Sequence, residues 1–220
     1  MVVILCGLMS PTALSAQTER TPYEDYRTIT TRKAMKVEYN GVRPTIADFA
    51  RAYCKTYPVA VTKALLRVLN TPSLAGTEDG GYMTETDEKN GYLKTKNVRW
   101  QFGDEIEMAC WRRNDGKMLL GVSFDTNTEG KSWTTADFYL FDPSTNELSP
   151  AGYIREKVYQ MICDKYKLDL VQRATISISM PQEGEDLVGF FWTGSDERGH
   201  STLFKVKWDG SWFNSVEAGE

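Results

Sequence analysis

Hydrophobic and polar residues alternate in short runs over most of the chain beyond residue 80. From Met118 to Phe124 every second residue is apolar, so these side chains fall on one side of an extended strand. The preceding stretch Asn114-Asp115-Gly116 contains an Asp-Gly pair, which tolerates the positive φ angles of tight hairpin turns. Another apolar, β-prone run ends just before this turn. The pattern therefore predicts a half-buried β-hairpin.

Similar β-prone runs, separated by clusters of turn residues, continue almost to the end of the sequence. The predicted strands are Tyr82–Thr86, Gly91–Lys96, Val98–Phe102, Ile106–Arg113, Lys117–Phe124, Ala136–Phe141, Ala174–Met180, Leu187–Thr193, Thr202–Trp208 and Trp212–Asn214. Many of the connections have the length of a hairpin turn. Sequential hairpins predict an antiparallel meander sheet.

Helical patterns precede and interrupt these strands. Thr45 and Asp48 form a capping pattern that predicts a helix through IADFARAYCKTY, and Pro58 interrupts it. Helical spacing resumes in PVAVTKALLRVLN and ends before Pro72. A third helix is predicted in IREKVYQMICDKYKL, where apolar residues recur on one face. We expect an α+β fold in which an N-terminal helix pair and one inserted helix pack on a curved, sandwich- or barrel-like antiparallel meander sheet.

The sequence starts with a short apolar segment followed by small residues, MVVILCGLMSPTALSA. This composition predicts a signal peptide at residues 1–16 and a single globular α+β domain at residues 17–220. No segment approaches the ~20 apolar residues that a membrane-spanning helix needs. Leu5 precedes Cys6, where lipoprotein processing requires a small residue. We therefore expect a secreted or periplasmic protein without a transmembrane segment or a lipid anchor.

The net charge limits the class of partner, and the cysteine content limits the possible metal sites and disulfides. The net charge of −4 and the absence of a Lys- and Arg-rich run argue against a nucleic-acid partner, because phosphate neutralisation needs a basic face. Cys54, Cys110 and Cys163 follow the predicted signal peptide, and none of them forms the close pair that a zinc site uses. Either two of them form a disulfide or, as their apolar surroundings favour, all three are buried thiols.

Three quoted segments carry a family resemblance: EKNGYL, CWRRNDGKMLLGVSF and FYLFDPSTNELSP. Together they resemble a group of uncharacterised secreted proteins of Bacteroidetes-type bacteria, in which a KNGY strand precedes a Gly-containing hairpin and a D-P-x-T-x-x-L turn. The resemblance covers residues 82–150 and consists mostly of turn residues. It implies export and a β-rich fold, and it implies no catalytic or ligand-binding residue.

Few residues indicate catalytic or metal chemistry. His200 is the sole histidine, and it follows Gly199 in a predicted turn, where we expect a solvated side chain rather than a catalytic base. The segment from Asp125 to Gly130 places Asp125, Asn127 and Glu129 at the alternate positions that begin a calcium loop. Position twelve of such a loop is Ala136 instead of Glu. We therefore expect an ordinary hairpin loop and no cofactor, with calcium as the alternative.

The aromatic content favours a binding function. The chain contains 6 tryptophans, all in or beside predicted strands. Exposed Trp side chains stack on sugars or anchor protein interfaces. Trp133 and Trp212, next to predicted loops, are the candidate ligand-binding residues, and the alternative is that the tryptophans fill the core. The leading hypothesis is an exported, non-catalytic binding protein for a glycan, a peptide or an envelope component.

Two other functions remain as alternatives. A carboxylate-dependent hydrolase such as a glycosidase needs two acidic side chains that face each other and at least one perturbed pKa. Acidic residues that lie close together in sequence, such as Asp104, Glu105 and Glu107, are the reason to consider it. A structural subunit would instead pair through a long, uncovered edge strand.

Overall fold

The computed structural model of the chain describes residues 27–99, 103–128, 131–193 and 200–219. Its strands are β1 (Met35–Lys36), β2 (Glu78–Asp79), β3 (Tyr82–Asp87), β4 (Tyr92–Asn97), β5 (Glu105–Arg112), β6 (Met118–Thr128), β7 (Lys131–Asp142), β8 (Glu147–Pro150), β9 (Ser177–Ser179), β10 (Leu187–Thr193), β11 (His200–Trp208) and β12 (Phe213–Ala218). Its helices are α2 (Ile46–Thr56), α3 (Ala60–Asn70), the short 3₁₀ helix η1 (Pro72–Leu74), α4 (Gly152–Tyr166) and α5 (Leu170–Arg173). The predicted signal peptide lies outside the described residues.

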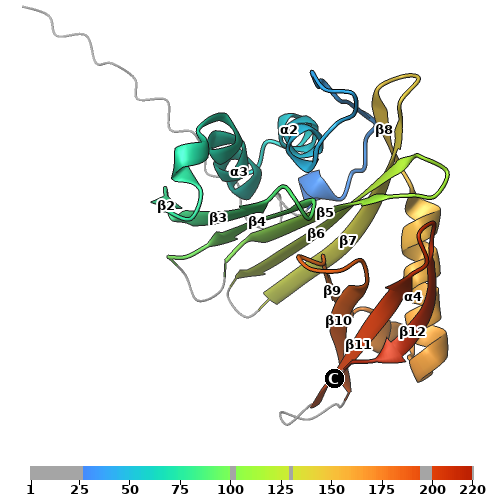
Figure 1. The fold of residues 1–220 in the computed structure, drawn as a ribbon. Helices are drawn as coiled ribbons and strands as arrows, with labels where there is room; N and C mark the ends of the chain where they lie inside the picture. The colour runs from blue at the N-terminus through green and yellow to red at the C-terminus, as the bar shows by residue number, and fades with distance from the viewer. Residues whose placement is uncertain (1–26, 100–102, 129–130, 194–199, 220) are drawn as a thin grey trace, which may run out of the picture.

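The strands form two antiparallel sheets (Figure 1). The larger sheet has the order β1-β8-β7-β6-β5-β4-β3-β2, and the smaller sheet has the order β12-β11-β10-β9. Consecutive strands are neighbours from β2 to β8 and again from β9 to β12, which confirms the predicted meander. The β5–β6 hairpin turns at Gly116, whose φ of 82° explains the need for glycine there. The larger sheet is open, because β1 and β2 form its two edges.

Several strand boundaries differ from the sequence-based prediction. β6 continues past Phe124 to Thr128, and β7 begins at Lys131, so the stretch predicted as a loop is mostly a paired ladder. Its β-branched threonines suit an extended backbone, although its Asp and Asn residues are typical of turns. The strand predicted at Val98–Phe102 does not begin at Val98, which follows the end of β4. The pattern missed β8, a four-residue strand that ends in proline.

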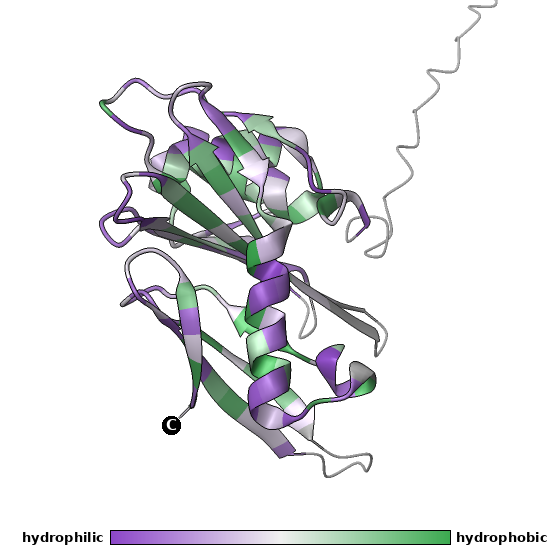
Figure 2. Ribbon diagram, turned by 90° about the vertical axis from the view of Figure 1, so that its right-hand side faces the viewer, coloured by the Kyte–Doolittle hydropathy of each residue, from purple (hydrophilic) through white to green (hydrophobic). Residues whose placement is uncertain are grey.

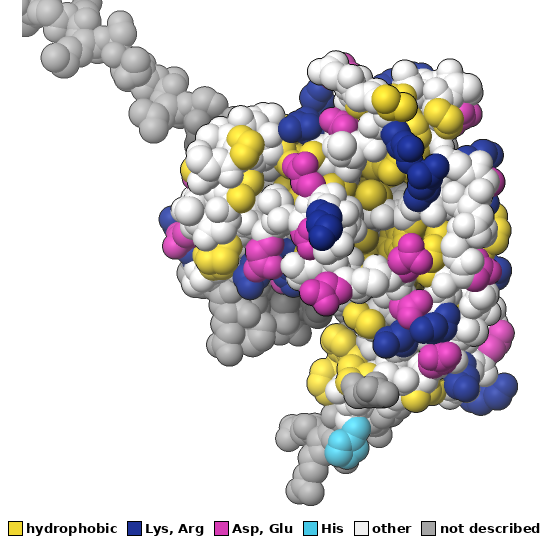
Figure 3. All heavy atoms as spheres, viewed as in Figure 1, with side chains coloured by type: hydrophobic (Ala, Val, Ile, Leu, Met, Phe, Trp, Pro, Cys, Tyr) yellow, Lys and Arg dark blue, Asp and Glu magenta, His cyan; other side chains and the backbone are white. Residues whose placement is uncertain are grey.

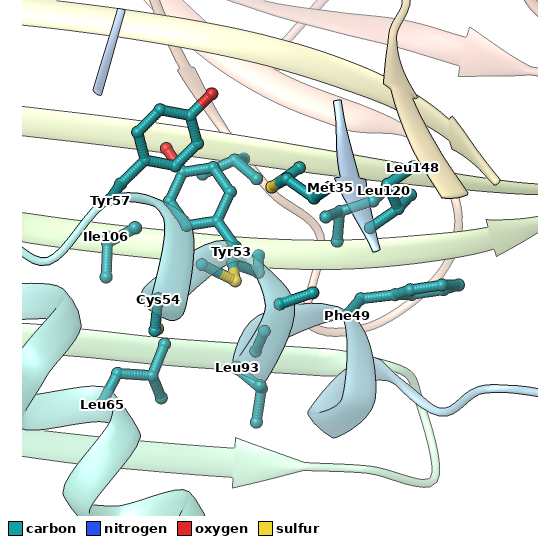
Figure 4. Packing of buried hydrophobic residues seen from close by; sticks show 14 of the residues in the cluster. Met35, Phe49, Tyr53, Cys54, Tyr57, Leu65, Leu93, Ile106, Leu120 and Leu148 are labelled. Atoms are coloured by element: carbon teal, nitrogen blue, oxygen red, sulfur yellow. The ribbon is translucent and has the colours of Figure 1, made fainter. Parts of the chain in front are cut away.

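The predicted helix pair covers one face of the larger sheet (Figure 1). Thr45 caps α2 as expected: its Oγ1 accepts a hydrogen bond from the Asp48 N–H, and the Asp48 carboxylate accepts one from the Thr45 N–H. Apolar side chains of α2 and α3, including Phe49, Tyr53 and Leu65, lie over the strands (Figure 4). They form a core with one side of β4–β7.

The smaller sheet and α4 pack on the opposite face of the larger sheet (Figure 2). Trp111 from β5 and Phe138 from β7 contact Phe213 of β12, with ring centroids 5.5 Å apart in both cases. The third predicted helix, α4, contributes Ile154, Val158 and Ile162 to this second core. β5, β6 and β7 therefore supply apolar residues to both cores, and each face of these strands contributes to a different core.

The remaining sequence-based expectations concern cysteines and membrane segments. Cys54 and Cys163 are buried, Cys110 is half-buried, and no two of these three form a disulfide. Burial raises the pKa of the Cys110 thiol to about 11, so this thiol stays protonated near neutral pH. Among the described helices, none has the length and apolar composition needed to span a membrane.

Candidate functional site

The two tryptophans predicted to bind a ligand lie on different elements: Trp133 is in β7, and Trp212 lies in the turn before β12. Trp212 is half-buried just after the Asp209-Gly210 turn, whose Asp209 carboxylate accepts hydrogen bonds from the Ser211 and Trp212 N–H groups. The Arg113 guanidinium lies 3.9 Å from the Trp212 ring centroid and covers one face of the indole. Trp133 belongs to β7, and its side chain is outside the described part of the structure.

The proposed calcium ligands fall at the end of the β6–β7 hairpin. Asp125 and Asn127 are both in β6, where an extended backbone separates alternate residues by about 7 Å. A calcium loop instead wraps its ligands around one ion. Glu129 and the Asn127 side chain lie outside the described residues. Within the described residues, no group of three or more His, Cys, Asp or Glu side chains is arranged to hold a metal ion.

A cluster of charged side chains occupies the part of the larger sheet next to the smaller sheet. Lys94 on β4 donates to Glu105 at 2.7 Å and to Glu107 at 2.9 Å. Glu107 is 7 % exposed, and its other carboxylate oxygen accepts a hydrogen bond from the Met180 N–H at 2.9 Å. Asp125 on β6 is the direct register partner of Glu105 on β5, so these two carboxylates face each other on one side of the sheet.

Burial controls the protonation of this charged cluster. It raises the pKa of Asp125 from 3.8 to about 6, against a smaller lowering effect of the nearby Thr134 hydroxyl. The nearby carboxylates of Glu105 and Glu107 add to the increase. Burial lowers the pKa of Lys94, but its hydrogen bonds to Glu105 and Glu107 outweigh this and raise it overall. Asp125 therefore keeps its proton at higher pH than an exposed aspartate, and Lys94 stays charged.

An open groove of about 260 Å³ lies at the end of the larger sheet that carries the β5–β6 turn, where three connecting segments meet. The segment before α2, the β5–β6 turn and the β7–β8 turn come together there, at the upper right of Figure 1. The groove is lined by Tyr39, Val42, Arg43, Pro44, Arg112, Gly116, Met118, Phe141 and Pro143. Most of these residues are apolar, and Val42 is 97 % exposed. Figure 3 shows hydrophobic side chains beside Lys and Arg side chains in this region.

The floor of this groove follows from the strand register. Arg112 pairs with Met118, and Met118 pairs with Phe141, so these residues form a row across β5, β6 and β7 on the face that carries α2. Tyr39 packs edge-on against Phe141 with ring centroids 6.1 Å apart. The Tyr39 hydroxyl donates to the Asn146 side chain at 3.3 Å, which fixes the ring over the β7–β8 turn. The groove therefore combines an apolar floor with arginines from two separate segments, β5 and the segment before α2.

Sequence reasoning missed the groove and one exposed aromatic surface. The groove joins three segments that are about 25 to 100 positions apart, so no local motif marks it. On the smaller sheet, Val188, Phe190 and Trp192 alternate toward the side away from the core, and Trp192 is 49 % exposed. The apolar residues on both faces of LVGFFWT were a signal that this strand had more apolar surface than one core covers. His200, by contrast, is exposed at the start of β11, as expected for a solvated residue.

Comparison with protein-family models, with curated proteins and with solved structures finds no match to this chain. The resemblance of residues 82–150 to secreted bacterial proteins therefore stays a prediction.

Proposed function

We propose that the protein is an exported, non-catalytic binding protein whose groove takes an apolar ligand or an apolar group of a partner. The observation that carries the proposal is the concave surface formed by Tyr39, Met118 and Phe141 with the loops around them. Apolar concave sites with a few convergent polar groups are the usual form of ligand sites in proteins. The groove lies on connecting segments held by a rigid sheet, which is where binding residues commonly occur.

The lining residues favour an apolar ligand over a glycan. Neutral sugars need several hydrogen-bonding partners for their hydroxyl groups and an open aromatic face for stacking. The lining side chains include no carboxylate or amide, and the ring of Phe141 is buried. The Tyr39 hydroxyl already donates to Asn146. Among the predicted partners, a peptide or an apolar small molecule therefore fits the groove better.

Paired substitutions of two apolar residues, the half-buried Met118 and the exposed Val188, test this proposal. Met118→Gln places a polar amide in the floor of the groove, whereas Val188→Gln makes the same kind of change on the smaller sheet. We expect apolar small molecules to shift NMR signals of groove residues in the unchanged protein and in Val188→Gln, with binding weakened about tenfold or more in Met118→Gln. Binding that is lost in Val188→Gln and kept in Met118→Gln would contradict the proposal, as would the absence of any shift at the groove.

A carboxylate-dependent hydrolase is the second candidate, and one specific observation favours it. Glu105 and Asp125 face each other across neighbouring strands, and Asp125 has a raised pKa, as a general acid requires. Side chains at directly opposed strand positions have Cβ atoms about 5 Å apart, so these two carboxyl groups come from neighbouring positions, as a glycosidase pair requires. The Glu105 side chain is 31 % exposed and can be reached from solvent.

Chromogenic glycosides provide the test of this second candidate. Hydrolysis that is present in the unchanged protein and lost in both Asp125→Asn and Glu105→Gln would support it. Asp164→Asn, on the exposed side of α4, is the matched control for loss of a carboxylate. If the purified protein turns over none of these substrates, or if both variants keep full activity, the glycosidase candidate is rejected and the binding proposal is unaffected.

A further inference from the structure

We infer that the ligand of the groove is a small carboxylate whose anionic group pairs with Arg112 and Arg43 while its apolar part lies against the half-buried side chains of Met118 and Tyr39. This inference rests on the proposed function and adds the chemical class of the ligand. It depends on which of the described arginines have a carboxylate partner and on where the two groove arginines lie relative to the apolar floor.

The arginines of the groove differ from seven other arginines in the described part of the structure. Each of these seven has a carboxylate oxygen within 4.0 Å: Arg32, Arg51, Arg67, Arg99, Arg113, Arg155 and Arg173. Within the described residues, the guanidinium groups of Arg43 and Arg112 have no such carboxylate and no hydrogen-bond partner. Two unpaired cations therefore lie at the one groove that we describe, in a protein of net charge −4.

The geometry separates the charged and apolar parts of the groove. Arg112 lies beside Met118 in the strand register, at the β5 end of the row that Phe141 completes. Arg43 comes from the segment before α2, next to the buried Pro44. Because Arg112 and Arg43 line the same groove as Met118 and Tyr39, a ligand with its apolar group on Met118 and Tyr39 has both arginines available for an adjacent anionic group. Guanidinium is planar and weakly hydrated, and it forms two parallel hydrogen bonds with a carboxylate.

The size of the groove limits the ligand. Sites for drug-sized molecules usually enclose about 300 to 1,000 Å³, whereas this groove has about 260 Å³ and is open to solvent. A molecule with one aromatic ring or one branched aliphatic group beside its carboxylate matches this volume. Exposed ion pairs contribute little, so we expect dissociation constants on the order of millimolar for such a minimal ligand.

Phenylacetate and phenylacetamide form a suitable pair of probes, because they share the same apolar group and differ in charge. The protein is labelled with ¹³C at its methionine methyl groups, and the Met118 signal is assigned with Met118→Leu. Met180, which is buried between the two sheets, supplies a control signal in the same spectrum. We expect phenylacetate to shift the Met118 signal and not the Met180 signal, with phenylacetamide binding about tenfold more weakly.

Substitution of the arginines completes the experiment. Arg112→Gln and Arg43→Gln are each expected to weaken phenylacetate binding by about threefold and to leave phenylacetamide binding unchanged. Lys63→Gln, on the exposed side of α3, removes the same charge far from the groove lining and should change binding by less than about twofold. Thermal unfolding of each variant verifies that it is folded.

The possible outcomes separate this inference from the proposed function. If phenylacetamide binds as tightly as phenylacetate at Met118, or if both arginine variants bind phenylacetate unchanged, the inference is overturned while the apolar groove remains a binding site. If neither probe shifts the Met118 signal, or if Met118 and Met180 shift together, both the inference and the proposed function of the groove are overturned.

Discussion

At the scale of single residues, Asp125 links burial to pH-dependent stability. Its pKa is raised to about 6 in the folded protein, so between about pH 4 and pH 6 the folded state holds a proton that the unfolded state has released. Stability must therefore fall as the pH rises through this range. The ionised side chain lowers the free energy of unfolding at pH 8 by at most about 3 kcal/mol relative to pH 4. Asp125→Asn should remove this loss, and urea unfolding from pH 4 to pH 8 measures it.

Asp142 provides a control of opposite sign. Hydrogen bonds from the Ser144 hydroxyl and N–H group hold its pKa below the ordinary value. This aspartate therefore contributes stability above its unfolded pKa, and the contribution is lost as the pH falls through its folded pKa. Asp142→Asn should be less stable than the unchanged protein at pH 7, with the difference shrinking in acid. Equal pH profiles for the two variants would contradict the assignment of Asp125 as the buried acid.

At the scale of secondary-structure elements, the start of α2 can be tested through its cap. Thr45→Ala removes the side-chain oxygen that accepts the Asp48 N–H, so the free energy of unfolding should fall by about 1 kcal/mol. Thr45→Ser keeps the hydroxyl and should stay within about half of that loss. Chemical unfolding followed by far-ultraviolet circular dichroism measures both variants. A loss of equal size in Thr45→Ser would mean that the methyl group, rather than the cap, accounts for the effect.

Local sequence chemistry was sufficient to predict elements whose signals lie within a few residues. The Asp115-Gly116 pair fixed the β5–β6 turn, and the pair of Thr45 and Asp48 fixed the start of α2. The extension of β6 beyond Phe124 could not be predicted in this way, because Asp and Asn favour turns while cross-strand pairing with β7 overrides that preference. β8 was not predicted for a similar reason, because its few residues are held in place by pairing with β7 and β1.

At the scale of the whole molecule, the groove depends on contacts between distant segments. β1 pairs with β8, and this pairing brings the chain before α2 beside the β7–β8 turn. The Val37 N–H donates to the Asn146 carbonyl, two residues before Tyr39 reaches the Asn146 side chain. The sequence alone does not indicate which strand β1 pairs with, because β1 has only 2 residues. The charged cluster on β4–β6 was partly foreseeable, since Glu105 and Glu107 were suspected and their strand register brings Asp125 to them.

The packing of the two sheets on each other rests on a glycine in β6. A side chain at Gly121 would place its Cβ 2.7 Å from the Met180 Sδ and 2.8 Å from the Trp111 Cζ3, so the layers could approach only where this side chain is absent. Gly121→Val should therefore lower the free energy of unfolding by about 1 to 3 kcal/mol, measured by urea unfolding with tryptophan fluorescence.

Gly152 is the matched control for this substitution. It begins α4, and a Cβ added there would meet no atom within 4 Å. Gly152→Ala should leave stability unchanged or raise it by less than about 1 kcal/mol, because alanine favours the helix. Because β5, β6 and β7 contribute to both cores, Gly121→Val should also lower the urea midpoints of unfolding measured by circular dichroism and by fluorescence, and both midpoints should shift by the same amount. Two separate transitions would show that the smaller sheet unfolds without the larger one, and that the two cores are independent of each other.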